Sequence, residues 1–73
     1  MANQEIKSEV TGTVWKIECK AGDRVAEGDV LMILESMKME IPVEATLAGE
    51  IVEITVQVDQ PVAEGDVVCV VRP

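Results

Sequence analysis

The sequence predicts an all-β domain: a flattened β-sandwich or barrel made of two similar four-stranded units with quasi-twofold symmetry. First, the hexapeptide Val-Ala-Glu-Gly-Asp-Val occurs at residues 25–30 and again at 62–67. Second, Val, Ile and Leu dominate the apolar residues, and β-branched side chains suit a pleated, half-buried surface. Third, the apolar segments have the length of strands, and no long stripe of helical period is present. The whole chain, residues 1–73, is expected to form one domain.

The repeat extends well beyond the hexapeptide. At the same spacing of 37 residues, Gly12 matches Gly49, and most apolar positions match as well. Two similar units therefore run over residues 5–34 and 42–71. Each unit must cover an apolar face, and packing the two units face to face achieves this.

Each unit contains a strand with a period of two residues. Residues 15–20 alternate between apolar and charged side chains, which places Trp15, Ile17 and Cys19 on one face. Residues 52–57 repeat the alternation of apolar and polar side chains. Continuous apolar runs that are too short for helices predict buried central strands at residues 30–34 and 67–71.

Turn residues separate these strands. Gly28 and Gly65 lie between acidic residues, where glycine supplies a positive φ most easily. Gly22 marks another turn, whose counterpart in the second unit contains Asp59, a residue type that tolerates the left-handed region.

Three further residues mark the ends and edges of strands. Gly12 and Gly49 are expected to lie at bends or bulges where each unit changes sheet. Pro42 has no amide hydrogen to donate, so it is expected at the edge of a sheet.

Residues 35–41 connect the two units and are predicted to form a hairpin that contains Lys38. Under quasi-twofold symmetry this hairpin projects at one end of the domain, because its counterpart in the second unit is the chain terminus. The N and C termini are then expected together at the opposite end.

The net charge of −8 argues against binding to nucleic acid or to anionic lipid. The six basic residues are scattered and form no stripe; they are Lys7, Lys16, Lys20, Arg24, Lys38 and Arg72. We interpret the acidity mainly as a source of solubility, with a partner that offers a basic groove as the alternative.

Cys19 and Cys69 are the two cysteines, and the chain has no histidine, so a zinc site is not expected. The first five residues are polar, no secretory signal is recognised, and no apolar run is long enough to span a bilayer. We therefore expect a cytoplasmic protein with reduced thiols, although the sequence leaves a disulfide between the two cysteines open.

Lys38 has the surroundings of a modified residue rather than of a catalytic one. A nucleophilic lysine must lose its proton through burial or nearby positive charge. Here Glu35 and Glu40 flank an exposed turn, and carboxylates favour the ammonium form. The residue would need an enzyme that supplies both a base and an activated acyl donor. The plain alternative is a solvated turn lysine.

Met37 and Met39 argue against that plain alternative. Apolar side chains at a hairpin tip are hard to bury, and exposed methionines suggest adaptable recognition by a partner. The sequence leaves open whether either methionine folds back onto the end of the sandwich.

The segment Glu-Ser-Met-Lys-Met-Glu at residues 35–40 resembles the attachment motif of biotinyl domains, the biotin carboxyl carrier family. The turn segments at residues 12–14, 21–25 and 27–31 match the family's pattern as well. The resemblance covers about residues 6–71 and is strongest to small single-domain biotin/lipoyl attachment proteins. It implies a flattened barrel of two four-stranded antiparallel sheets with the lysine at a hairpin tip.

The resemblance also implies a function, that of a non-catalytic carrier. Biotin protein ligase would join biotin to Lys38 as an amide, and the tethered biotin would carry carboxylate from a biotin carboxylase to a carboxyltransferase. Met37 and Met39 would serve ligase recognition and positioning during carboxylation, and Glu35 matches an acidic position that helps to exclude the wrong ligase.

The chain departs from the family at two places, and two alternatives remain. Residues 9–12 read Glu-Val-Thr-Gly where many relatives have Pro-Met-Pro-Gly, and Ser36 replaces a common Ala. The main alternative is a lipoyl carrier of the same fold, whose hairpin usually has an acid directly before the lysine. The other is a binding module in which Lys38 stays unmodified.

Overall fold

Eight short strands form two antiparallel four-stranded sheets in the computed structural model, which describes residues 2–73. Residue 1 of the expected domain therefore lies outside the described part. The all-β prediction is confirmed. The strands are β1 (Gln4–Lys7), β2 (Gly12–Ile17), β3 (Arg24–Val25), β4 (Val30–Ser36), β5 (Met39–Glu44), β6 (Gly49–Ile54), β7 (Pro61–Val62) and β8 (Val67–Arg72).

Each sheet combines strands from both halves of the sequence. One sheet has the order β1-β8-β6-β3, and the other has the order β5-β4-β2-β7. The two units therefore interlock, and the expectation that one unit simply faces the other was wrong in this respect. The short strand β3 pairs with β6 of the second half, and β7 pairs with β2 of the first. This exchange ties each half to the other through main-chain hydrogen bonds.

The quasi-twofold symmetry extends to individual hydrogen bonds. The amide of Ser8 donates to the carbonyl oxygen of Asp66 at 2.8 Å, and the matching amide of Ala45 donates to Asp29 at 2.8 Å. The turns match too: Gly28 and Gly65 have φ values of 93° and 92°. Asp59 has a φ of 73°, as the sequence predicts for the counterpart of Gly22.

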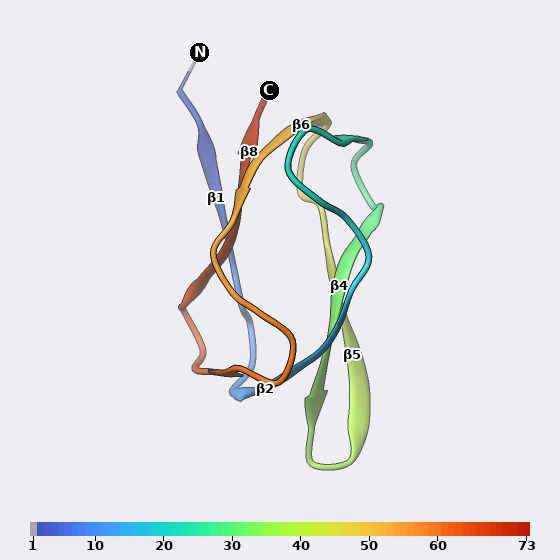
Figure 1. Cartoon of the computed structure of the whole chain (residues 1–73), viewed down its shortest axis with the longest axis vertical. Helices are drawn as coiled ribbons and strands as arrows, with labels where there is room; N and C mark the ends of the chain where they lie inside the picture. Colours follow the sequence, from blue (N-terminus) through green and yellow to red (C-terminus); the bar gives the residue numbers. More distant parts are fainter. Residues whose placement is uncertain (1) are drawn as a thin grey trace.

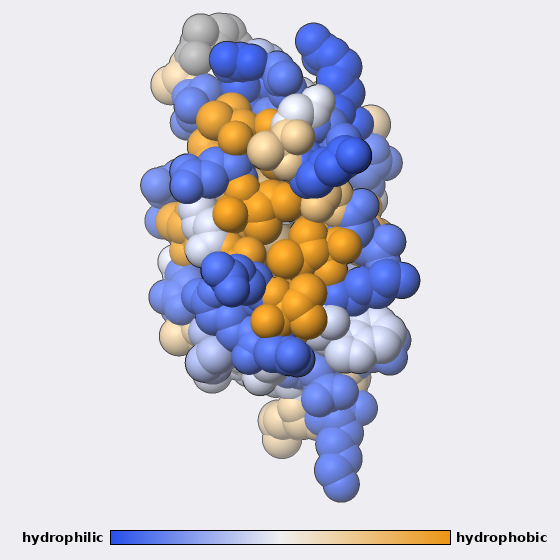
Figure 2. All heavy atoms as spheres, in the orientation of Figure 1, coloured by the Kyte–Doolittle hydropathy of each residue, from blue (hydrophilic) through white to orange (hydrophobic). Residues whose placement is uncertain are grey.

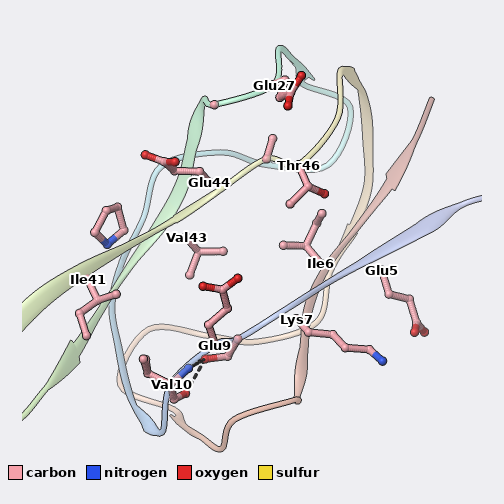
Figure 3. A pocket seen from close by; sticks show the side chains of 14 residues that line it. Glu5, Ile6, Lys7, Glu9, Val10, Glu27, Ile41, Val43, Glu44 and Thr46 are labelled. Atoms are coloured by element: carbon pink, nitrogen blue, oxygen red, sulfur yellow. Dashed lines mark hydrogen bonds between the residues drawn. The ribbon is translucent and has the colours of Figure 1, made fainter.

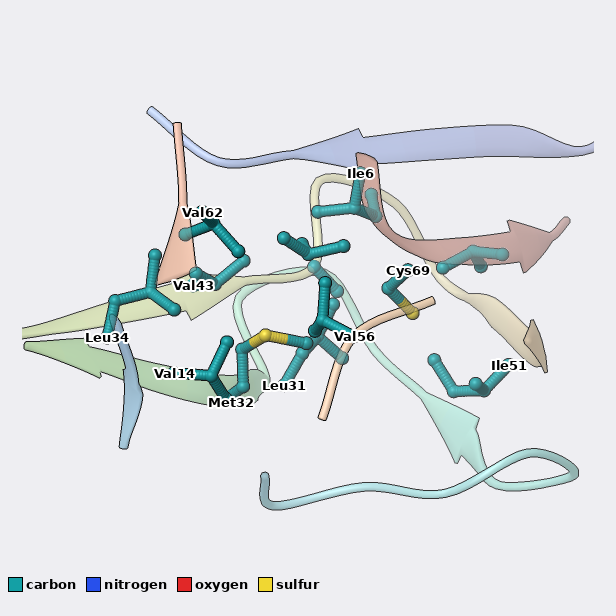
Figure 4. Packing of buried hydrophobic residues seen from close by; sticks show 13 residues of the cluster. Ile6, Val14, Leu31, Met32, Leu34, Val43, Ile51, Val56, Val62 and Cys69 are labelled. Atoms are coloured by element: carbon teal, nitrogen blue, oxygen red, sulfur yellow. The ribbon is translucent and has the colours of Figure 1, made fainter. Parts of the chain in front are cut away.

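A small aliphatic core lies between the sheets, with side chains from both layers pointing toward one another (Figure 4). The predicted central strands β4 and β8 supply most of its fully buried residues. The core residues are Ile6, Val14, Leu31, Met32, Leu34, Val43, Ala45, Ile51, Val56, Val62, Val68, Cys69 and Val71. The sequence-based alternation fails at Trp15, which is 46% exposed, because Val14 takes the buried position beside it.

Bulges at Trp15 and Val52 explain that failure. The pairing of β2 with β4 shifts between Val14 and Lys16, and the pairing of β6 with β8 shifts at the equivalent place. An extra residue in one strand turns the following side chains to the other face. Trp15 and Val52 are these extra residues, so the bulges do not lie at Gly12 and Gly49 as predicted.

The two glycines instead allow strands to approach closely. A Cβ atom built on Gly12 would lie 2.5 Å from the carbonyl oxygen of Glu35, and one on Gly49 would meet the carbonyl oxygen of Arg72. Pro42 lies in the edge strand β5, as expected from its missing amide hydrogen.

The molecule is elongated, with extents of 36 × 17 × 17 Å. The β4–β5 hairpin projects at one end, and both termini lie at the other (Figure 1). Quasi-twofold symmetry produces this polarity, because the hairpin is the central connection and its counterpart is the C-terminal end of β8. Within residues 2–73 there is no helix long and apolar enough to cross a membrane.

Candidate functional site

Lys38 lies in a two-residue turn at the tip of the projecting hairpin. Ser36 pairs with Met39 across the base of the turn, which leaves Met37 and Lys38 as its central residues. Their φ values are 52° and 65°. Two successive left-handed residues are the geometry of a type I′ turn, whose twist matches that of the flanking strands.

Neither central residue is a glycine or an asparagine, so the turn is strained. Left-handed backbone costs a residue with a Cβ about 1–3 kcal/mol. The regular pairing of β4 with β5, which continues from Ser36 back to Met32, holds the turn in this shape. Strain of this kind is concentrated at functional positions.

Both methionines of the tip face solvent. Met37 is 92% exposed and Met39 is 63% exposed, so neither folds back onto the sandwich. In Figure 2 the tip is the narrow projection at the bottom, where hydrophilic and mildly hydrophobic atoms stand side by side. An amine framed by two thioethers is thus presented away from the body of the domain.

Two carboxylates lie beneath the turn. Glu35 and Glu40 are directly opposite each other in the register of β4 and β5, and both are exposed. Like charges in this arrangement repel each other. In the part of the chain that the structure describes, the ion pairs are Lys16–Glu18 and Arg72–Glu50, so neither carboxylate fixes the Lys38 ammonium.

The base of the hairpin is fastened to the segment before β2. The hydroxyl of Ser36 donates a hydrogen bond of 2.9 Å to the carbonyl oxygen of Thr11. The hydroxyl oxygen of Thr11 in turn accepts a hydrogen bond of 3.1 Å from the amide of Glu64. Sequence reasoning missed this arrangement, and the one signal for it was the hydroxyl of Ser36 itself.

A hollow of about 590 Å³ lies beside the hairpin, between the edge strands β1 and β5. Figure 3 shows Glu9 pointing into its middle, near Val43. Its lining carries four carboxylates and one amine, from Glu5, Glu9, Glu27, Glu44 and Lys7. The tip residues do not line it, so the hollow is no pocket for the Lys38 side chain.

The thiols show no sign of a reactive site. Cys69 is fully buried, Cys19 is partly buried, and both are free. Burial is the main reason that the pKa of Cys69 rises to about 11, and burial also raises the pKa of Cys19. Across residues 2–73, no three His, Cys, Asp or Glu side chains are grouped so as to hold a metal ion.

The chain resembles proteins of known kind over nearly its whole length. A family model described as "Biotin-requiring enzyme" matches residues 2–71. A "Biotinylated protein TB7.3 homolog" of Mycobacterium leprae is 38% identical over 68 residues, which cover 93% of this chain and 96% of the relative. A "Biotin/lipoyl attachment protein" of Bacillus subtilis is 42% identical over 62 residues, which cover 85% of each chain.

The fold has a close counterpart among solved structures. The crystal structure of Kluyveromyces lactis urea carboxylase matches with a TM-score of 0.93 and 36% identity, over 99% of this chain. The match covers only 6% of that much longer protein, so it describes one small domain of it.

Proposed function

The chain belongs to the biotin/lipoyl attachment family, and on that premise we propose that it is a non-catalytic biotin carboxyl carrier with Lys38 as the attachment residue. The observation that carries the proposal is the turn itself. Lys38 lies in a strained two-residue turn, between two exposed methionines. This turn is at one end of the domain's long dimension of 36 Å.

The exposed tip suits a lysine that is a substrate for another enzyme. A ligase must bring the amine to an activated biotin, so the amine has to enter a site on a second protein. A hairpin that projects from a rigid body allows this without unfolding. Met37 and Met39 would contact the ligase, because thioethers adapt to varied apolar surfaces.

The same geometry suits a carrier. Biotin held by an amide to Lys38 would accept carboxylate at a biotin carboxylase site and release it at a carboxyltransferase site. Because the biotin is covalently tethered, it is present at high effective concentration near the second site once it has left the first. The cofactor carries the chemistry, and this chain's residues position it. The carrier functions as a domain of residues 1–73 or as the equivalent part of a larger assembly.

Biotin is favoured over lipoate by the residues next to the lysine. In lipoyl domains an acid usually precedes the modified lysine, whereas Met37 stands there in this chain. We propose that Glu35, exposed at the hairpin base, helps to exclude a lipoate-attaching enzyme.

Labelling by a biotin ligase with ATP and biotin tests the proposal. We expect one biotin per chain, on Lys38, and none on a Lys38→Arg variant. Lys20→Arg is the matched control, because Lys20 is also an exposed lysine, and it should be labelled like the wild type. Labelling that survives Lys38→Arg would contradict the proposal. So would attachment of lipoate in place of biotin when a biotin ligase and a lipoate-attaching enzyme are both supplied.

A further inference from the structure

Trp15 lies on the outer face of the sheet that carries the hairpin, next to Lys16, which pairs with Ile33 of β4. The bulge at this position leaves the indole 46% exposed. Ile33 lies between Met32 and Leu34, which are both fully buried, so its side chain points to the outer face. Ile33 in turn pairs with Pro42 on β5. We call these three residues, Trp15, Ile33 and Pro42, the Trp15 face.

The quasi-twofold symmetry provides an internal comparison for this surface. At the equivalent positions of the other sheet, 37 residues away along the chain, stand Val52, Val70 and Glu5. That surface has no aromatic residue and includes a carboxylate, and it lies toward the termini (Figure 1). The fold is the same at both places, so the fold alone does not require a tryptophan at position 15.

The Trp15 face is close to the tip. Lys38 follows Ile33 by five residues, which corresponds to at most roughly 16–17 Å at ~3.3 Å per residue. A standard protein interface covers about 800 Å² on each partner, equivalent to a disc of roughly 16 Å radius. An enzyme whose active site surrounds the Lys38 amine will therefore cover part of the hairpin's flanks.

The two flanks of the hairpin differ in chemistry. The edge strand β5 borders the hollow with its four carboxylates, and Pro42 lies where this flank meets the outer one. The outer flank has the apolar Trp15 face, with Glu35 and Glu40 between it and the tip. Burying a large, half-exposed aromatic side chain in an interface is a common source of binding energy, and tryptophan is enriched among the residues that supply it.

Building on the proposed function, we propose that the Trp15 face is the surface on which the biotin ligase docks while it acts on Lys38. The matching ligase surface has an apolar depression for the indole and basic side chains that face Glu35 and Glu40. The ligase is the partner chosen here because it acts on the bare lysine. Enzymes that act on biotin reach the cofactor through the added length of the tether and can stay further from the sheet.

Steady-state biotinylation of Trp15→Thr and Val52→Thr tests the proposal. Val52 is the equivalent bulge residue and is 39% exposed, so both variants replace an exposed apolar residue by one that favours strands. We expect the KM for the carrier to rise about tenfold or more in Trp15→Thr, with kcat unchanged, and to stay the same in Val52→Thr. Circular dichroism and thermal unfolding confirm that both variants are folded.

A second measurement leaves position 15 intact. Trp15 is the one tryptophan of the chain, so a ¹⁵N-labelled carrier gives a single indole N–H signal. Unlabelled ligase, loaded with biotin and ATP, is added to a labelled Lys38→Arg carrier, which cannot be modified. We expect the indole signal to shift or broaden in proportion to the ligase added.

Several results would overturn the docking surface. They are an unchanged KM in Trp15→Thr, an equal rise in both variants, an indole signal that ignores the ligase, or an effect seen only in the carboxylation of biotin. A wild-type carrier that is not labelled at all would instead remove the proposed function, and this docking surface with it.

Discussion

The hydroxyl of Ser36 donates a hydrogen bond of 2.9 Å to the main-chain carbonyl of Thr11, a residue 25 positions earlier in the chain. This contact joins the base of the hairpin to the segment that enters β2. Thr11 is itself held by the amide of Glu64, from the turn before β8. The hairpin tip is therefore connected to both halves of the domain at its base.

Replacing Ser36 with alanine removes this bond. The bond is exposed, so we expect a loss of only about 0.5–1 kcal/mol in the free energy of unfolding in urea. Thr55→Ala is the matched control, because the Thr55 hydroxyl donates a comparable exposed bond to the carbonyl of Val67. Amide exchange at residues 37–40 should become faster in Ser36→Ala and stay unchanged in Thr55→Ala. Equal exchange in the two variants would show that the Ser36 bond does not hold the hairpin.

Alanine at Gly12 or Gly49 should destabilise the domain. In each case the new Cβ would collide with a main-chain carbonyl oxygen, of Glu35 or of Arg72. Overpacking of this kind costs about 1–3 kcal/mol, measured by chemical unfolding. Because Glu35 lies in the hairpin and Arg72 does not, only Gly12→Ala should also slow biotinylation of Lys38 while both proteins are fully folded. If Gly49→Ala slowed biotinylation equally, the effect of Gly12→Ala could not be attributed to its clash with the hairpin.

Relieving the strain of the turn should stabilise the domain at the expense of recognition. Asparagine adopts left-handed backbone more easily than methionine, so Met37→Asn should raise the free energy of unfolding by about 1 kcal/mol. Met39→Asn makes the same chemical change outside the turn and should not stabilise. Both variants lose an exposed thioether and should be biotinylated more slowly than the wild type. A stabilised Met37→Asn that is labelled at the normal rate would exclude a role for Met37 in recognition.

The buried thiol of Cys69 should make stability fall at alkaline pH. Its pKa of about 11 in the folded protein lies above the ordinary value of 9.0, so the unfolded chain releases the thiol proton first. The contribution is complete below pH 9 and is lost as the pH rises toward 11. Urea unfolding across this range, with Cys69→Val as the control, should show a steeper fall for the wild type. Parallel curves would rule out this contribution.

The internal repeat was enough to predict the fold class, the polarity of the molecule and the place of Lys38. Symmetry-related hexapeptides and apolar runs are local patterns, and they directly report strands and turns. The interlocking of the sheets was not predictable in this way. The interlocking depends on which strands pair with each other, such as β3 with β6. Pairing between segments that are distant in the sequence leaves no local signal.

The bulge at Trp15 was likewise not predictable from a local sequence pattern. Period-two alternation placed Trp15 on the face shared with Ile17, but one extra residue in β2 moved the indole outward. The exposure of Met37 and Met39 was likewise open until the twist of the turn was known. The contact of Ser36 with Thr11 was hidden because it joins residues far apart in sequence.

The most direct test of the account is the modification state of the protein purified from its own cells. Intact mass, followed by peptide mass spectrometry, would identify the group on each lysine. The account predicts biotin on Lys38 and on no other of the chain's lysines, in at least a fraction of the molecules. Lipoate on Lys38, or biotin on a different lysine with Lys38 bare, would contradict it.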